Sequence, residues 1–279
     1  MRQFLEPEDY LEPVCVLCDP TGESGKRTNI QPIPLQRVID RLDSYMSRRD
    51  YEGAEKHLLY WLQEAVRGHD QRGQLMVCNE LIGYCRKTNQ RDKAFQYADQ
   101  ALRLLDEMDF DGTISSGTTC VNIATAYQAF GEYERSLELF EKAEAIYESS
   151  QAIRPHQLGG LYNNMALTFK ALARYPEAFN YFEKAMDEMG KAPGGVLEQA
   201  ITCLNMADAV AERDGQEAGE EKIFSLLDKA YDLLRDESAP HNGYYAFVCE
   251  KCAPAFSYYG YFAAAEELQK TAERIYERP

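Results

Sequence analysis

Asparagine recurs at one position of three successive segments of this 279-residue chain. The three residues are Asn122, Asn164 and Asn205, and each lies 41 or 42 residues after the one before it. A side-chain amide carries both donors and an acceptor, so it can pair with the N–H and C=O groups of an extended peptide without reading its side chains. We therefore predict that these three amides form a row that binds a peptide backbone.

Other polar residues fall on the same predicted helices and complete the candidate site. Basic side chains among them could hold a carboxylate through charge-assisted hydrogen bonds. These further candidates are Asn79, Arg86, Lys87, Gln128, Asn163, Lys170 and Asp208. The alternative is that the asparagines bond an adjacent helical segment and stabilise the stack, with no contact to a ligand.

The elements that must position these residues are helices, because residues 119–189 contain one helical pattern twice. Each copy has a large, an aliphatic, a small and an aromatic residue on a first helix, in 120–127 and again in 162–169. A second helix then carries small, aromatic and alanine residues, and Ala143 and Ala185 are 42 residues apart. Small residues at fixed positions let neighbouring helices approach closely, so the pattern predicts stacked helical hairpins.

This pattern resembles that of tetratricopeptide-repeat proteins over residues 35–279, most specifically over 117–190. The resemblance implies an all-α fold, a right-handed superhelical solenoid of about six helical hairpins within residues 34–279. We expect the solenoid to close with helix 262–276, whose outward positions are polar, and no further domain to follow. Residues 1–33 are rich in proline and predict a non-repeat N-terminal arm. The repeats are expected near 35–73, 75–115, 117–157, 159–197, 200–238 and 246–279.

The period near 42 residues and the asparagine-rich first helices are similar to kinesin light chain repeats and to the bacterial Rap and PlcR-like peptide receptors. In those families asparagines on the concave face bind peptide backbone, which implies this role for Asn122, Asn164 and Asn205 and extends it to Asn79 and Asn163. Receptors of this kind that regulate transcription carry an N-terminal helix-turn-helix, which residues 1–33 cannot supply. The resemblance therefore implies peptide or protein binding, in a bacterial protein without a DNA-binding domain.

Cysteine provides the one candidate metal site. Cys15 and Cys18 form half of a structural zinc site, which normally needs two such pairs. The second pair, Cys249 and Cys252, lies at the other end of the chain. We therefore expect no metal and no cofactor, with zinc at Cys15 and Cys18 as the alternative. Since the sequence also lacks a nucleophile elbow, a glycine-rich cofactor loop and a histidine metal pair, we expect no enzymatic activity.

Composition narrows the partners. A net charge of −16 opposes binding to nucleic acid, whose affinity for proteins comes largely from Lys and Arg. No apolar run approaches the ~20 residues that span a bilayer, and the N-terminus lacks a signal-peptide core, so we expect a cytoplasmic protein with no membrane partner. The sequence thus predicts a non-catalytic scaffold or adaptor that binds an extended peptide or protein segment in its concave groove, as a monomer or a homodimer. The alternative is a cytoplasmic receptor for a short signalling peptide.

Overall fold

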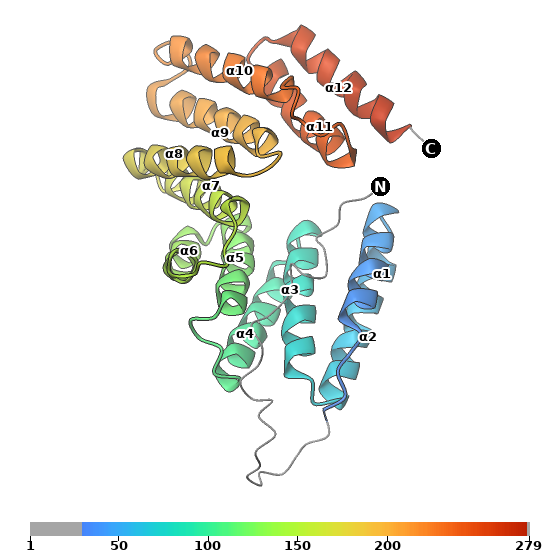
Figure 1. The fold of residues 1–279 in the computed structure, drawn as a ribbon. Helices are drawn as coiled ribbons and strands as arrows, with labels where there is room; N and C mark the ends of the chain where they lie inside the picture. The colour runs from blue at the N-terminus through green and yellow to red at the C-terminus, as the bar shows by residue number, and fades with distance from the viewer. Residues whose placement is uncertain (1–29, 278–279) are drawn as a thin grey trace.

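The computed structural model describes residues 30–277, which form six consecutive pairs of α-helices and no β-strand (Figure 1). This confirms the predicted all-α solenoid of helical hairpins. The helices are α1 (Leu35–Ser47), α2 (Tyr51–Arg67), α3 (Gln71–Lys87), α4 (Arg91–Glu107), α5 (Ile114–Ala129), α6 (Tyr133–Ser149), α7 (Pro155–Ala171), α8 (Tyr175–Lys191), α9 (Val196–Asp214), α10 (Glu220–Leu234), α11 (Gly243–Tyr258) and α12 (Phe262–Tyr276).

The hairpins stack into an arc. Each odd-numbered helix packs on the even-numbered helix that follows it, and α3, α5, α7, α9 and α11 also contact one another in turn. Figure 1 shows α6, α8 and α10 on the outer side of the arc. We call the surface formed by α1, α3, α5, α7, α9 and α11 the inner face.

Small and aromatic residues alternate in the packing as the repeat pattern predicts. Ala143 and Ala185 are fully buried, and so are Phe140 and Phe182, which lie three residues before them. Ser136 occupies a similarly closed position, and its hydroxyl donates to the Ala124 carbonyl at 2.8 Å. Because this polar atom is hydrogen-bonded, its burial costs little.

The turns inside the hairpins are nearly identical. Five of them contain three residues, and the middle one has a positive φ. Glycine holds this position in two hairpins, as Gly131 and Gly260, whereas Ala173 adopts the same conformation at φ 56° in the fourth. The fifth hairpin differs, because residues 215–219 separate its two helices.

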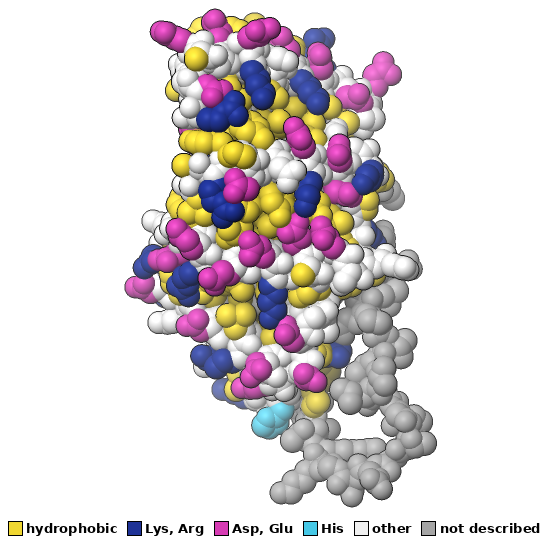
Figure 2. Space-filling view, turned by 90° about the vertical axis from the view of Figure 1, so that its left-hand side faces the viewer, with side chains coloured by type: hydrophobic (Ala, Val, Ile, Leu, Met, Phe, Trp, Pro, Cys, Tyr) yellow, Lys and Arg dark blue, Asp and Glu magenta, His cyan; other side chains and the backbone are white. Residues whose placement is uncertain are grey.

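The outer side of the arc carries charges of both signs, with hydrophobic patches between them (Figure 2). Figure 2 shows Lys and Arg interspersed with Asp and Glu across it. Several of these charges join consecutive second helices: Lys93 on α4 pairs with Glu55 on α2 at 2.6 Å, and Lys184 on α8 pairs with Glu144 on α6 at 3.1 Å. Such half-exposed pairs contribute little stability each.

The last residues before α1 are anchored on the turn between α2 and α3. The backbone N–H of Gln31 donates to the Gly68 carbonyl, and that of Ile33 donates to Asp70 Oδ2, both at 2.9 Å. The same Asp70 carboxylate accepts from the Gly73 N–H and so also caps α3. The remainder of the predicted N-terminal arm, with Cys15 and Cys18, lies outside the described residues, so the zinc alternative stays a prediction.

Candidate ligand-binding surface

The predicted asparagine row lies on the inner face, where it takes part in two equivalent hydrogen-bond networks. On α3, Asn79 donates to Thr119 Oγ1 at 3.0 Å and accepts from Asn122 Nδ2 at 3.2 Å. On α7, Asn163 Oδ1 accepts from Thr202 Oγ1 at 3.3 Å and from Asn205 Nδ2 at 3.1 Å. Each network joins one hairpin to the next. Asn79 and Asn163 therefore act as links between hairpins.

The side-chain amides of Asn122, Asn164 and Asn205 have hydrogen-bonding groups that no described residue satisfies. Asn122 and Asn205 each donate one N–H to the preceding hairpin, which leaves the carbonyl oxygen and the second N–H of each amide without a partner among residues 30–277. The Asn164 side chain forms no hydrogen bond with any of the described residues, although its backbone carbonyl accepts from Gln128 Nε2 at 2.9 Å. All three side chains are half-buried on the inner face. The row thus retains hydrogen-bonding capacity of both kinds.

Three other predicted residues bond to their neighbours. Gln128 also donates to Thr168 Oγ1 at 2.9 Å, which joins α5 to α7. Lys170 on α7 forms an ion pair of 2.7 Å with Glu212 on α9. Asp208 on α9 accepts from the Tyr259 hydroxyl at 2.9 Å. These residues also connect hairpins, and a ligand would have to displace or share their contacts.

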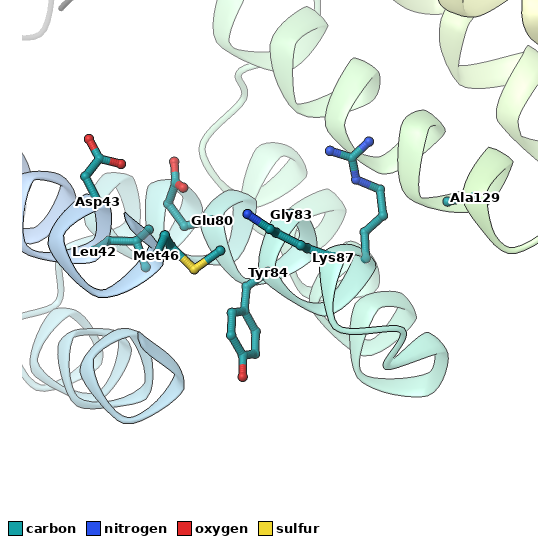
Figure 3. A pocket seen from close by; sticks show the side chains of 9 residues that line it. Leu42, Asp43, Met46, Glu80, Gly83, Tyr84, Lys87 and Ala129 are labelled. Carbon is teal, nitrogen blue, oxygen red and sulfur yellow. The ribbon is translucent and has the colours of Figure 1, made fainter. Parts of the chain in front are cut away.

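Arg86 and Lys87, at the end of α3, line a cavity on the inner face with a volume of about 570 Å³ (Figure 3). Arg86 forms no hydrogen bond or ion pair with residues 30–277, and partial loss of solvent around its guanidinium lowers its pKa. The cavity is open to the inner face, and both basic side chains are exposed. The other lining residues are Leu42, Asp43, Met46, Glu80, Gly83, Tyr84 and Ala129.

Glu80 is a charged residue of this cavity that is not among the predicted site residues. Burial raises the pKa of its carboxyl to about 7, and the nearby Asp43 adds to the effect. In the repeat register Glu80 stands where the next three hairpins carry Asn122, Asn164 and Asn205. A charged residue in a row of neutral amides was the signal that could have identified it.

Aromatic side chains occupy the opposite end of the inner face. Tyr244 and Phe247 on α11 are 46% and 48% exposed, and their rings stack with centroids 6.1 Å apart. The Tyr244 hydroxyl donates to Glu198 on α9. Burial raises the pKa of Glu198, and the positive charge of Lys251 opposes that rise. The two ends of the inner face therefore differ, with a charged cavity at α3 and aromatic rings at α11.

The cysteines of the described part are buried and unpaired. Cys78, Cys85, Cys120, Cys203, Cys249 and Cys252 are free thiols. Residues 30–277 contain no group of three or more His, Cys, Asp and Glu side chains placed to hold a metal ion. None of their helices is long and apolar enough to cross a membrane.

Residues 117–149 and 159–188 match the tetratricopeptide repeat family. This chain contains tetratricopeptide repeats, and its described residues have the fold of a tetratricopeptide-repeat solenoid. The matched residues are those of α5 to α8, the two hairpins whose internal repetition is clearest in the sequence.

Comparison with known proteins places these tetratricopeptide repeats near those of kinesin light chains. The Arabidopsis thaliana protein KINESIN LIGHT CHAIN-RELATED 3 is 22% identical over 214 residues, which are 72% of this chain and 31% of the relative. The chain thus spans about a third of that relative's length. The crystal structure of nearly identical TPR-like repeats from a kinesin light chain candidate of Podosopora anserina superposes with a TM-score of 0.51 at 18% identity, covering 74% of this chain and 98% of that chain.

The predicted similarity to kinesin light chain repeats is confirmed by both comparisons. Aspartyl phosphate phosphatase F from Bacillus subtilis superposes with a lower TM-score of 0.42, at 15% identity, over 87% of this chain and 69% of that chain. At such identities the structural likeness concerns the fold of the repeats.

Proposed function

We propose that this tetratricopeptide-repeat protein is a non-catalytic scaffold or adaptor that holds an extended peptide or protein segment on its inner face. The fold supports a protein-binding role, because stacked hairpins present one long continuous surface. Six free thiols buried in the core fit a reducing compartment, so we place the protein in the cytoplasm.

The observation that carries the proposal is the unused hydrogen-bonding capacity of Asn122, Asn164 and Asn205. Their positions correspond in three consecutive hairpins, and each half-buried amide can still bind a group from outside. An extended peptide that crosses these helices would meet a donor and an acceptor at each hairpin. Because backbone groups are the same in every peptide, the row would supply affinity, and other residues of the inner face would supply specificity.

Selection from a displayed library of random dodecapeptides tests this proposal. Selected peptides are synthesised with a fluorophore, and their binding to the full chain is measured by fluorescence anisotropy. Loss of hydrogen bonds from one amide should weaken binding about tenfold in Asn164→Ala. Asn180→Ala is the matched control, because Asn180 is exposed on α8, away from the inner face.

Two results would contradict the proposal. One is a library that yields no binder. The other is a set of binders whose affinity is the same for Asn164→Ala and for Asn180→Ala, since those peptides would then bind elsewhere on the protein.

A further inference from the structure

The cavity between α1, α3 and α5 combines charges of both signs above an apolar floor. Leu42, Met46 and Tyr84 line it together with Asp43, Glu80, Arg86 and Lys87. Figure 3 shows the carboxyl groups of Asp43 and Glu80 rising from neighbouring helices toward the same side. A volume of about 570 Å³ is enough for two or three amino-acid residues of a ligand.

The Glu80 carboxyl lies in this cavity, and no described residue neutralises its charge. Its half-buried carboxyl forms no hydrogen bond or ion pair with residues 30–277. The charged residue that affects its pKa is Asp43, whose charge has the same sign. Burial without a partner favours the neutral carboxyl, which raises the pKa. A positively charged group placed beside the Glu80 carboxyl would offset the cost of its burial.

Arg86, on the same helix, is a positive charge that no described residue neutralises. It too has no hydrogen bond or ion pair within the described residues, and reduced solvation lowers the pKa of its guanidinium. Arg86 follows Glu80 by six positions, so at a rise of about 1.5 Å per residue their backbones are separated by ~9 Å along α3. The two groups do not pair with each other, whereas Lys170 and Glu212, also on the inner face, do.

We propose that this cavity is a subsite for a dipolar stretch of the bound peptide. A positively charged group of the ligand pairs with Glu80, and a negatively charged group about three residues away pairs with Arg86 and Lys87. The spacing applies to a stretch of the peptide that lies along α3, before the chain turns to cross the asparagine row, because an extended peptide advances about 3.3 Å per residue. This inference rests on the proposed function, since it assigns one part of the peptide to one end of the inner face.

Defined peptides test the subsite. Four dodecapeptides share a Gly, Ser and Ala background and carry Lys then Glu three positions later, Glu then Lys three positions later, Lys alone, or Glu alone. The two orders are both needed because the backbone can run in either direction. Binding to the full chain is measured by nuclear magnetic resonance, with an isotope-labelled protein and a library-selected peptide as positive control.

One of the two dipolar peptides should bind about tenfold more tightly than either singly charged peptide, and it should shift amide signals of α1, α3 and α5. Glu80→Gln should abolish the contribution of the Lys residue, and Arg86→Gln that of the Glu residue. Glu80→Gln keeps the side-chain shape, whereas Arg86→Gln removes the charge and shortens the side chain. Glu183→Gln, an exposed site on α8, is the matched control and should change neither.

The outcomes separate the subsite from the proposed function. If the library-selected peptide binds while the four defined peptides show no charge preference, the subsite is wrong and the scaffold function stands. If Glu80→Gln and Glu183→Gln behave alike, the subsite is again wrong. If neither the library peptide nor any defined peptide binds, the proposed function fails and the subsite fails with it.

Discussion

The side-chain amide of Asn122 donates to Asn79 Oδ1 at 3.2 Å, across the boundary between the second and third hairpins. Asn205 repeats this relationship with Asn163 at 3.1 Å, two hairpins later. In each pair the earlier asparagine orients the later one and leaves the later carbonyl oxygen unused among the described residues. Asn79 and Asn163 are therefore positioning residues, and Asn122 and Asn205 are the residues that they position.

Asn79→Ala should lower both stability and peptide affinity. The substitution removes the bonds to Thr119 and Asn122, and we expect the free energy of unfolding to fall by about 1–2 kcal/mol in urea denaturation. Asn164→Ala breaks no side-chain hydrogen bond with the described residues, so it should weaken peptide binding while the urea midpoint stays unchanged. Equal losses of stability in the two variants would argue against this division of roles.

Glu80→Gln should stabilise the protein at high pH. Burial, with a smaller contribution from Asp43, raises the carboxyl pKa from 4.5 to about 7, so between these pH values the folded chain holds a proton that the unfolded chain releases. The free energy of unfolding contributed by Glu80 therefore falls as pH rises through this window. Relative to the wild type, Glu80→Gln should gain roughly 1–3 kcal/mol at pH 8 and little at pH 5. Urea denaturation at the two pH values measures the difference, and Glu183→Gln should show none.

Ala173→Gly should raise stability. Ala173 has φ 56° in a turn where other hairpins carry Gly131 and Gly260, and a side chain in this conformation costs about 1 kcal/mol. After the entropy of the more flexible unfolded glycine is subtracted, we expect a net gain of about 0.5 kcal/mol in thermal or urea unfolding. The reverse change, Gly131→Ala, should destabilise the protein, because no atom lies within 4 Å of its new methyl group and only the backbone strain is altered.

The buried thiols should resist alkylation in the native state. Burial raises the pKa of Cys78 and Cys252 to about 12 and that of Cys85 and Cys203 to about 11, so almost no reactive thiolate forms at pH 8. Iodoacetamide followed by peptide mass spectrometry should leave the thiols of residues 30–277 unmodified. All of them should react in urea. Rapid native labelling of Cys249 or Cys252 would show that α11 opens more easily than the packing indicates.

The repeat architecture could be predicted because its causes are local and recur along the chain. Ala143 and Ala185 have similar neighbours at the same spacing. The helices and buried positions predicted for one hairpin could therefore be transferred to the next. The helical pairing follows from this repetition, since a first helix can bury its apolar residues only against the helix that comes after it and the adjacent hairpin.

The use of each inner-face residue was decided by tertiary structure. Asn163 and Asn164 are the same residue type at adjacent positions, yet Asn163 meets Thr202 and Asn205 from the next hairpin while the Asn164 amide meets none of the described residues. Glu80 differs from the many solvated glutamates because α1 places Asp43 beside it and the surrounding residues partly bury its carboxyl. Sequence alone determined which helices pair and which residues are buried between them. Only the stacked structure decided which polar groups remain available, because their partners lie about forty residues away along the chain.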